Sequence, residues 1–277
     1  MFRRSAIAAI LAIGLTVTGS GFIAEAAVAP PTPMAALGDS ITRAYNTGPS
    51  AYQDYPASSW STGTTFTVNS HLLRFGAPAP TAFNDAVSGA KMVDLLAQAN
   101  VAAGQKPAYV TILMGGNDIC TRTEADMTAP ATFETQFRSA LAALTAGSAS
   151  PKIFVASIPN VTNLWTVLKD NGSARFIWSI FGICQSLLAR PTSMLAADVQ
   201  RRANVATRNG DLNTKLRMVC AEFAACLYDG GAVFNTAFTA ADVSTRDYFH
   251  PSVNGQKRLA CATWNASYWA PVSKPTC

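Results

Sequence analysis

Ser40 lies just past a short apolar run and is the first residue whose setting suggests chemistry. The run Met34–Leu37 has the composition of a buried strand, and Gly38-Asp39-Ser40 follows it directly. A strand that stops at a tight turn presents the next hydroxyl at the edge of the sheet. That is a suitable place for a nucleophile, which must be exposed and within reach of a general base. We therefore predict that Ser40 is the attacking group.

Asp247 and His250, near the far end of the chain, supply the candidate base. The aspartate precedes the histidine by three residues, so one turn of chain can bring its carboxylate to the imidazole. Such a carboxylate fixes the tautomer and stabilises the imidazolium that forms when the histidine takes a proton. The other histidine, His71, lies in a polar segment with no carboxylate close in sequence. We predict catalytic roles for His250 and Asp247 and a structural role for His71.

Acyl transfer also needs hydrogen-bond donors aimed at the developing oxyanion, and two further segments offer them. Asn117 follows the apolar run Ala108–Met114 and two glycines, so its side-chain amide is expected at the carboxyl end of a strand. Open α/β sheets bind ligands at that edge. Gly89 follows the run Ala82–Val87 and offers an N–H in the same way. An ordinary strand-to-helix turn is the alternative at both positions, and taken alone it is the better interpretation of Gly89.

Other reaction classes lack their motifs in this chain. It has no G-x-S-x-G nucleophile elbow, no G-x-x-x-x-G-K-[ST] phosphate loop and no G-x-G-x-x-G. No C-x-x-C is present, and two histidines so far apart cannot form H-E-x-x-H. We expect neither a metal nor a cofactor.

The elements that must position these residues alternate along the chain. Apolar runs that predict strands are Met34–Leu37, Ala82–Val87, Ala108–Met114, Lys152–Ile158 and Phe223–Tyr228. Amphipathic stretches that predict helices are Lys91–Ala103, Ala131–Ala146, Met194–Thr207 with an extension to Val219, and Val253–Tyr268. Continuously apolar strands that alternate with helices indicate βαβ units and a parallel sheet covered on both faces. The apolar but poorly periodic segment Asn160–Pro191 has two interpretations, an extra helix on the core or an apolar wall for an acyl chain.

Composition and the N-terminus indicate one exported globular domain. Of 277 residues, 49% are hydrophobic and 13% charged, and the net charge of +5 is scattered, which does not favour nucleic-acid binding. Arg3 and Arg4, an apolar stretch from Ala6 to Val17 and the small residues around Ala26 predict a signal peptide over residues 1–26. A short membrane anchor is the alternative. Residues 27–277 would then form one secreted domain, which we expect to be monomeric.

Six cysteines follow the predicted signal peptide, an even number that indicates about three disulfides in an exported chain. Six cysteines allow 15 pairings. We expect sequential pairing: Cys120–Cys184, Cys220–Cys226 and Cys261–Cys277.

Four blocks of this sequence resemble the SGNH, or GDSL, hydrolase superfamily. They are Gly38-Asp39-Ser40-Ile41, Gly89, Gly116-Asn117-Asp118 and Asp247-x-x-His250, and they occur in the family's order. The resemblance implies a flavodoxin-like α/β/α sandwich with about five parallel strands. It also implies that Ser40 is the nucleophile, His250 the base and Asp247 its orienting carboxylate. The oxyanion hole would combine the Ser40 and Gly89 amides with the Asn117 side chain.

A narrower likeness bears on the substrate. Ser59–Gly63, Gly116–Cys120 and Tyr248–Ser252 resemble their counterparts in phospholipase B-like members. We therefore expect a secreted carboxylic-ester hydrolase that acts on lipid acyl esters, glyceride or phospholipid, at a membrane or micelle surface. The alternatives are an acetylesterase acting on cell-wall or plant polysaccharide, an acyltransferase with the same acyl-enzyme, and a non-catalytic surface-binding protein that retains the fold.

Overall fold

The computed structural model describes Met1 and residues 30–76, 79–147 and 150–270 of the chain. Apart from Met1, the predicted signal peptide over residues 1–26 lies outside the described residues, and so does Cys277. Across the described ranges, no helix combines the length and the apolar character needed to cross a membrane.

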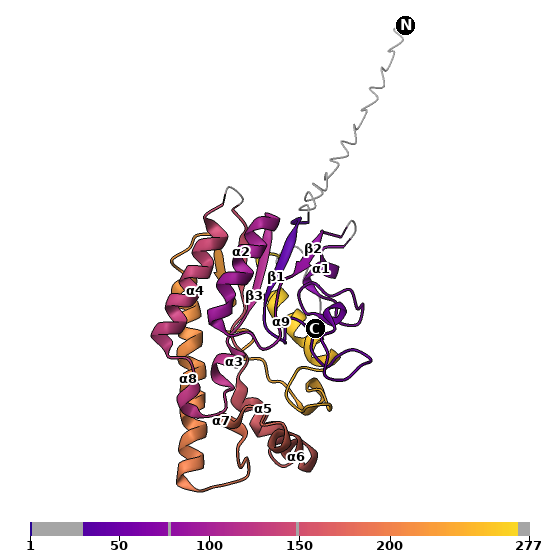
Figure 1. Cartoon of the computed structure of the whole chain (residues 1–277). Helices are drawn as coiled ribbons and strands as arrows, with labels where there is room; N and C mark the ends of the chain where they lie inside the picture. The colour runs from indigo at the N-terminus through magenta and orange to yellow at the C-terminus, as the bar shows by residue number, and fades with distance from the viewer. Residues whose placement is uncertain (2–29, 77–78, 148–149, 271–277) are drawn as a thin grey trace.

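A five-stranded, all-parallel sheet forms the centre of the molecule, in the order β2-β1-β3-β4-β5 (Figure 1). The strands are β1 (Met34–Gly38), β2 (Ala82–Asn84), β3 (Tyr109–Leu113), β4 (Lys152–Val155) and β5 (Cys226–Tyr228). Every residue of β1 and β3 is buried, as expected of central strands covered on both faces. The predicted α/β architecture and strand number are confirmed. β5 begins three residues later than predicted, because the Cys226 N–H closes a turn onto the Phe223 carbonyl.

Helices cover both faces of the sheet, and others lie beyond its carboxyl edge. They are α1 (His71–Arg74), α2 (Leu95–Gln105), α3 (Gly116–Ile119), α4 (Pro130–Thr145), α5 (Val161–Leu168), α6 (Gly172–Ile180), α7 (Gln185–Leu188), α8 (Ala196–Cys220) and α9 (Val253–Asn265). Single 3-10 turns are η1 (Pro56–Ser58), η2 (Met92–Asp94), η3 (Glu124–Asp126) and η4 (Ala240–Asp242).

Alternate residues of each strand enter different cores, because successive side chains of a strand point to opposite faces. Ala35 and Leu37 of β1 pack with α2, α4 and α8 on one face. Met34 of the same strand packs with Trp60, α1 and α9 on the other face. Figure 1 shows α2, α4 and α8 to the left of the sheet and α9 to the right.

The chain reverses its direction of winding at β1. It passes from β1 to β2 on one side and then crosses to β3 on the other side of β1. The carboxyl ends of neighbouring strands adjoin an open crevice at such a switch point, where flavodoxin-like sheets bind ligands. Ser40, Gly89 and Asn117 follow β1, β2 and β3 respectively.

The segment Asn160–Pro191 forms the short helices α5, α6 and α7 beyond the carboxyl edge of the sheet, at the bottom of Figure 1. Trp178, Leu187 and Leu188 are buried in the larger core, as an extra helical layer requires. Other side chains of α5 line a pocket beside His250, described below. The segment therefore forms extra helices on the core and also lines this pocket, while its role as a wall for an acyl chain stays a prediction.

Two disulfides are described. Cys120 pairs with Cys184 and joins the end of α3 to the start of α7. Cys220 pairs with Cys226 and joins the end of α8 to β5. Both pairs are among the three expected from sequential pairing. The third expected pair, Cys261–Cys277, stays a prediction because Cys277 lies outside the described residues.

Candidate active site

Ser40, His250 and Asp247 form a continuous chain of hydrogen bonds. The Ser40 Oγ is 2.7 Å from His250 Nε2, and His250 Nδ1 is 2.7 Å from Asp247 Oδ2. Ser40 directly follows β1, while Asp247 and His250 lie in the turn that leads into α9. The Gly38 backbone (φ +148°) makes the turn after β1, and a Cβ there would lie 2.4 Å from the Leu113 carbonyl oxygen. Only glycine fits this position, which brings Ser40 to the edge of the sheet.

The Asp247 carboxylate is held by four donors. Oδ1 accepts the Phe249 and His250 N–H groups at 2.9 and 3.0 Å, and Oδ2 accepts His250 Nδ1 and the Asn46 side-chain amide. Burial raises the pKa of Asp247, but the hydrogen bond and charge of His250 and the two backbone N–H groups outweigh it, so the pKa is lowered. Asp247 is thus ionised, as a partner of an imidazolium must be.

Asn46 is a site residue that sequence reasoning missed. It is buried, has φ +65°, and its Oδ1 accepts the Tyr52 N–H while its amide reaches Asp247. Asparagine adopts this left-handed conformation more readily than most residues. An asparagine in a polar loop was therefore the one signal in the sequence that could have indicated Asn46. Many surface loops contain such an asparagine, so the signal is not specific.

Three groups beyond the carboxyl ends of β1, β2 and β3 are the candidate donors to a substrate carbonyl oxygen at Ser40. Among the described residues, neither the Ser40 N–H nor the Gly89 N–H donates to a protein acceptor. Gly89 has φ +85° with open space around it. The Asn117 amide donates one hydrogen to the Ala90 carbonyl at 2.9 Å, which orients the group and leaves its second hydrogen free. The strand order thus places the three residues that the sequence singles out after neighbouring strands, β2, β1 and β3.

A polar network ties the Gly89 loop to the nucleophile loop, and the sequence analysis did not anticipate it. Asp54 accepts Arg43 Nε at 3.0 Å and also the Ser88 hydroxyl. Arg43 donates in addition to the Asn84 carbonyl at the end of β2. Ser88, next to Gly89, is therefore linked through Asp54 to Arg43, three residues past Ser40. These contacts join the loops that carry the Ser40 and Gly89 N–H groups.

Asp39, the immediate neighbour of Ser40, holds the turn rather than the histidine. Its Oδ1 accepts the Ile41 N–H at 2.9 Å, whereas the carboxylate bound to His250 Nδ1 is that of Asp247. Burial raises the pKa of Asp39 to about 6. The geometry thus assigns Asp39 to the turn and Asp247 to the histidine.

His71 lies in the smaller core, where its two ring nitrogens contact the Tyr109 hydroxyl at 3.0 Å and the Thr263 hydroxyl at 2.8 Å. Burial lowers its pKa to about 3. The structural role expected of His71 matches this position, although the residue is buried at the start of α1 rather than in a polar loop.

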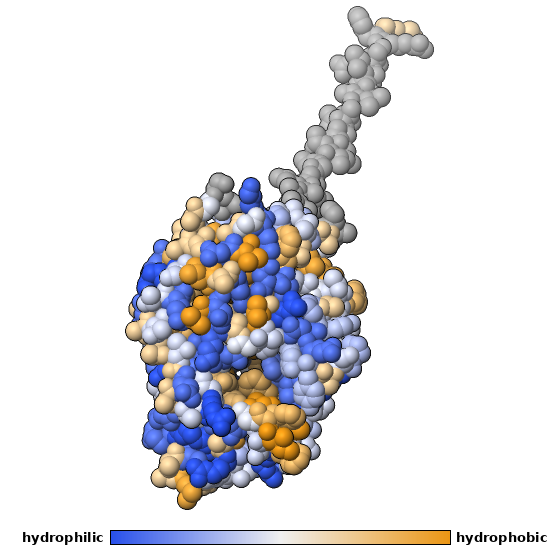
Figure 2. Space-filling view, in the orientation of Figure 1, coloured by the Kyte–Doolittle hydropathy of each residue, from blue (hydrophilic) through white to orange (hydrophobic). Residues whose placement is uncertain are grey.

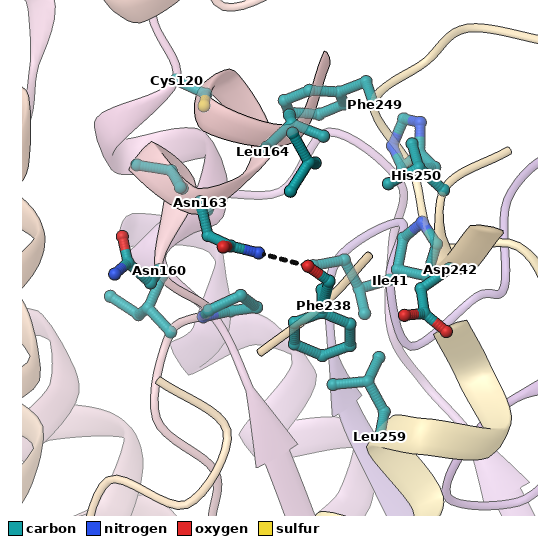
Figure 3. Close-up of a pocket in the computed structure, with 17 residues that line it drawn as sticks. Ile41, Cys120, Asn160, Asn163, Leu164, Phe238, Asp242, Phe249, His250 and Leu259 are labelled. Atoms are coloured by element: carbon teal, nitrogen blue, oxygen red, sulfur yellow. Dashed lines mark hydrogen bonds between the residues drawn. The ribbon is translucent and has the colours of Figure 1, made fainter. Parts of the chain in front are cut away.

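Two cavities adjoin His250 and Phe249. The first, of about 90 Å³, is mainly apolar and is drawn in Figure 3 with Ile41, Leu164, Phe249 and Leu259 around it. Asn163 of α5 donates to the Phe238 carbonyl at 2.7 Å and fixes one wall. The second, of about 310 Å³, is lined by Tyr45, Tyr52, Asn117, Cys120, Phe181, Ile183, Cys184, Asp247, Phe249 and His250.

The described ranges contain no group of three or more histidine, cysteine, aspartate or glutamate side chains that could hold a metal ion. A serine, an imidazole, a carboxylate and three hydrogen-bond donors are the parts that acyl transfer needs.

The fold and this arrangement define an enzyme that hydrolyses ester bonds. A family model described as the GDSL-like Lipase/Acylhydrolase family matches residues 36–258. The chain belongs to this family, and the resemblance to SGNH hydrolases noted in its sequence is confirmed.

Solved structures show the same fold. A single-residue variant of an acetyl xylan esterase from Geobacillus stearothermophilus is similar, with a TM-score of 0.52 and 17% identity over 88% of this chain and 95% of that one. A candidate GDSL-like lipase from Parabacteroides merdae has a TM-score of 0.53 and 19% identity over 87% of this chain and 95% of that one. A comparison with curated proteins finds no match.

Proposed function

We propose that the protein is a secreted hydrolase of lipid acyl esters that works through an acyl-enzyme on Ser40. The observation that carries the chemistry is the hydrogen-bond chain from Ser40 through His250 to Asp247. His250 Nε2 takes the Ser40 proton while Oγ attacks the ester carbonyl carbon. His250 then returns that proton to the leaving alcohol, and the acyl group stays on Ser40. Water, deprotonated by His250, then attacks the acyl carbon; the bond to Ser40 Oγ breaks, Oγ takes that proton back from His250, and the acid is released.

The oxyanion of each tetrahedral intermediate would be held by the Ser40 and Gly89 amides and the Asn117 side chain. These donors have fixed positions before substrate arrives, which is what makes such a site effective. The contact of Asn117 with the Ala90 carbonyl supports this role.

The apolar cavity beside His250 supports an acyl substrate. Its walls include Val161, Leu164 and Val167 of α5 and Phe249 next to His250. An acyl chain bound there would place its ester carbonyl at Ser40, and the apolar walls favour hydrocarbon over hydrated groups.

Two described disulfides support an oxidising compartment. We further propose that residues 1–26 are removed and residues 27–277 form the secreted domain.

An acetylesterase of polysaccharide is the second candidate, and one observation favours it. The cavity volume of about 90 Å³ is below the range of roughly 300–1,000 Å³ usual for ligand pockets, so a short acyl group fills it more easily than a long one.

A substrate panel with the purified protein tests both proposals. p-Nitrophenyl esters from acetyl to palmitoyl, a glyceride, a phospholipid and acetylated xylan would be compared, with Ser40→Ala as the inactive control. The lipid proposal expects turnover to rise with chain length and to include the glyceride or phospholipid. A sharp preference for acetyl esters together with release of acetate from xylan would replace it by the acetylesterase. Unaltered turnover in Ser40→Ala would refute the acyl-enzyme.

A further inference from the structure

Helix α6 exposes large apolar side chains on one side, while its other side packs on the core. Phe176 and Ile180 are 63% and 59% exposed and lie one turn apart, and Phe181 at the helix end is 57% exposed. Ala174 and Trp178, on the other side, are fully buried. Figure 2 shows this apolar cluster over α5 and α6, with strongly hydrophilic residues beside it. A single exposed apolar residue is ordinary, but a cluster on one helix face indicates a partner.

The apolar face is continuous with the candidate active site. Phe181 and Ile183 line the same cavity of about 310 Å³ as Asn117 and His250. The Phe181 ring lies 5.8 Å from the ring of Tyr52 across the cavity mouth. A partner that covers α6 would therefore also cover the entrance to the site.

Arginine side chains lie close to the C-terminal end of α6, near Ser179 and Gly182. A cavity of about 500 Å³ runs from Ser179 and Gly182 to Arg122, Arg190 and Arg201, with one acidic residue, Glu124, in its lining. Arg190 and Arg201 pair with Asp198 at 3.0 and 3.2 Å, while Arg190 keeps 67% of its side chain exposed. Arg122 is also exposed. The apolar face thus has a basic edge.

We propose that α6 docks on an anionic phospholipid surface and delivers lipid esters from that surface to Ser40. Phe176, Ile180 and Phe181 enter the boundary between headgroups and acyl chains, while Arg122 and Arg190 contact headgroup phosphates. An amphipathic helix with apolar residues on one side and basic residues beside them is the arrangement that binds such surfaces. The basic edge formed by Arg122 and Arg190 complements anionic headgroups, which is why lipid is the occupant. The inference rests on the proposed lipid-ester function.

Vesicle binding by the inactive Ser40→Ala protein tests the docking separately from catalysis. Sedimentation with phosphatidylglycerol vesicles would compare Ser40→Ala alone with the same protein carrying Phe176→Ser and Ile180→Ser. We expect the double change to weaken binding at least about tenfold, since two apolar side chains no longer leave water. The matched control is Val101→Ser with Met218→Ser, which removes exposed apolar side chains from α2 and α8 and leaves binding unchanged. Arg122→Gln lowers binding to phosphatidylglycerol about fivefold, the effect of one basic residue near the surface, and not to phosphatidylcholine.

Catalysis by the same variants with Ser40 intact separates this inference from the proposed function. Phe176→Ser with Ile180→Ser keeps kcat/KM on a water-soluble acetyl ester and lowers turnover on vesicles. Vesicle binding equal to that of the parent overturns the docking surface, whether or not lipid is hydrolysed. A dimer that the double change dissociates also overturns it, because a second copy is then the occupant. Binding that depends on these residues without lipid hydrolysis retains the surface and overturns the proposed substrate.

Discussion

Two buried aspartates lie near His250, and their surroundings drive their pKa values in opposite directions. Burial raises the pKa of Asp39 to about 6, although the Ile41 N–H donates a hydrogen bond to its carboxylate. Burial also raises the pKa of Asp247, but the hydrogen bond and charge of the His250 ring and the Phe249 and His250 N–H groups keep it below the ordinary value. Hydrogen bonds to the ionised carboxylate therefore favour Asp247 over Asp39 as the partner of His250. The shorter distance in sequence between Asp39 and Ser40 does not decide the choice.

Asn46→Gly isolates one of the donors to Asp247. Glycine accepts φ +65° without strain, so the change removes the amide donor to Asp247, together with the Oδ1 acceptor of the Tyr52 N–H, without straining the backbone. We expect kcat on a soluble ester to fall roughly tenfold to a hundredfold, since a hydrogen bond to a charged group is worth about 1.5–3 kcal/mol. KM changes little because Asn46 lines neither cavity at His250. Asn69→Gly, at another left-handed asparagine (φ +52°), is the control. Equal kcat in both variants would remove Asn46 from the positioning of Asp247.

Asn117→Ala tests the oxyanion donor that is a side chain. The loss of one such donor typically costs roughly 10²–10³ in kcat, and we expect a loss of that size in steady-state hydrolysis of a soluble ester. Circular dichroism would show the fold unchanged, because the amide contacts one carbonyl, that of Ala90. A loss of less than about tenfold would mean that the two backbone amides suffice.

At the scale of elements, the sequence predicts the strands and the residues that follow them far better than it predicts the loops. Ser40, Gly89 and Asn117 each follow an apolar run, and parallel pairing of β1, β2 and β3 brings their carboxyl ends together. Asn46 and Asp54 lie in a polar loop without periodicity. Their partners Asp247 and Ser88 are 201 and 34 residues away. Such long-range pairings follow from tertiary packing, which no local pattern encodes.

The two described disulfides differ in the length of chain that they close, and this predicts different contributions to stability. Cys120 and Cys184 are 64 residues apart, while Cys220 and Cys226 are 6 apart. A longer closed loop restricts the unfolded chain more, so we expect Cys120→Ala with Cys184→Ala to lower the free energy of unfolding by roughly 4 kcal/mol. The other double change costs roughly 2 kcal/mol on the same reasoning. Urea denaturation compares them, and the reverse order would contradict the loop-length account.

Cys120 also lies near Asn117 and lines both cavities at His250. The same two variants therefore differ in activity. Removal of Cys120–Cys184 frees α3 from the start of α7 and lowers kcat, whereas removal of Cys220–Cys226, at the end of α8, leaves kcat unchanged.

At the scale of the whole molecule, His71 joins the sheet to the layer of helices behind it. Its ring contacts the hydroxyls of Tyr109 in β3 and Thr263 in α9, and it is fully buried. Burial lowers the pKa to about 3 from the ordinary value of 6.5. The unfolded chain therefore takes up a proton near pH 6.5, while the folded chain does not until about pH 3. The stability that His71 contributes is complete above pH 6.5 and is lost as the pH falls toward 3.

His71→Gln removes this dependence while keeping a side chain that can donate and accept hydrogen bonds. Between about pH 7 and pH 4 the parent is expected to lose about 3 kcal/mol of unfolding free energy through His71, a loss that the variant lacks. Asp39 acts in the opposite sense, because its raised pKa of about 6 makes the folded chain take up a proton first as the pH falls. That contribution is the same in both proteins, so the difference between their pH slopes isolates His71. Urea denaturation at several pH values measures both slopes. Parallel slopes would show that His71 becomes protonated in the folded protein without cost, and that its contacts with Tyr109 and Thr263 tolerate the charge.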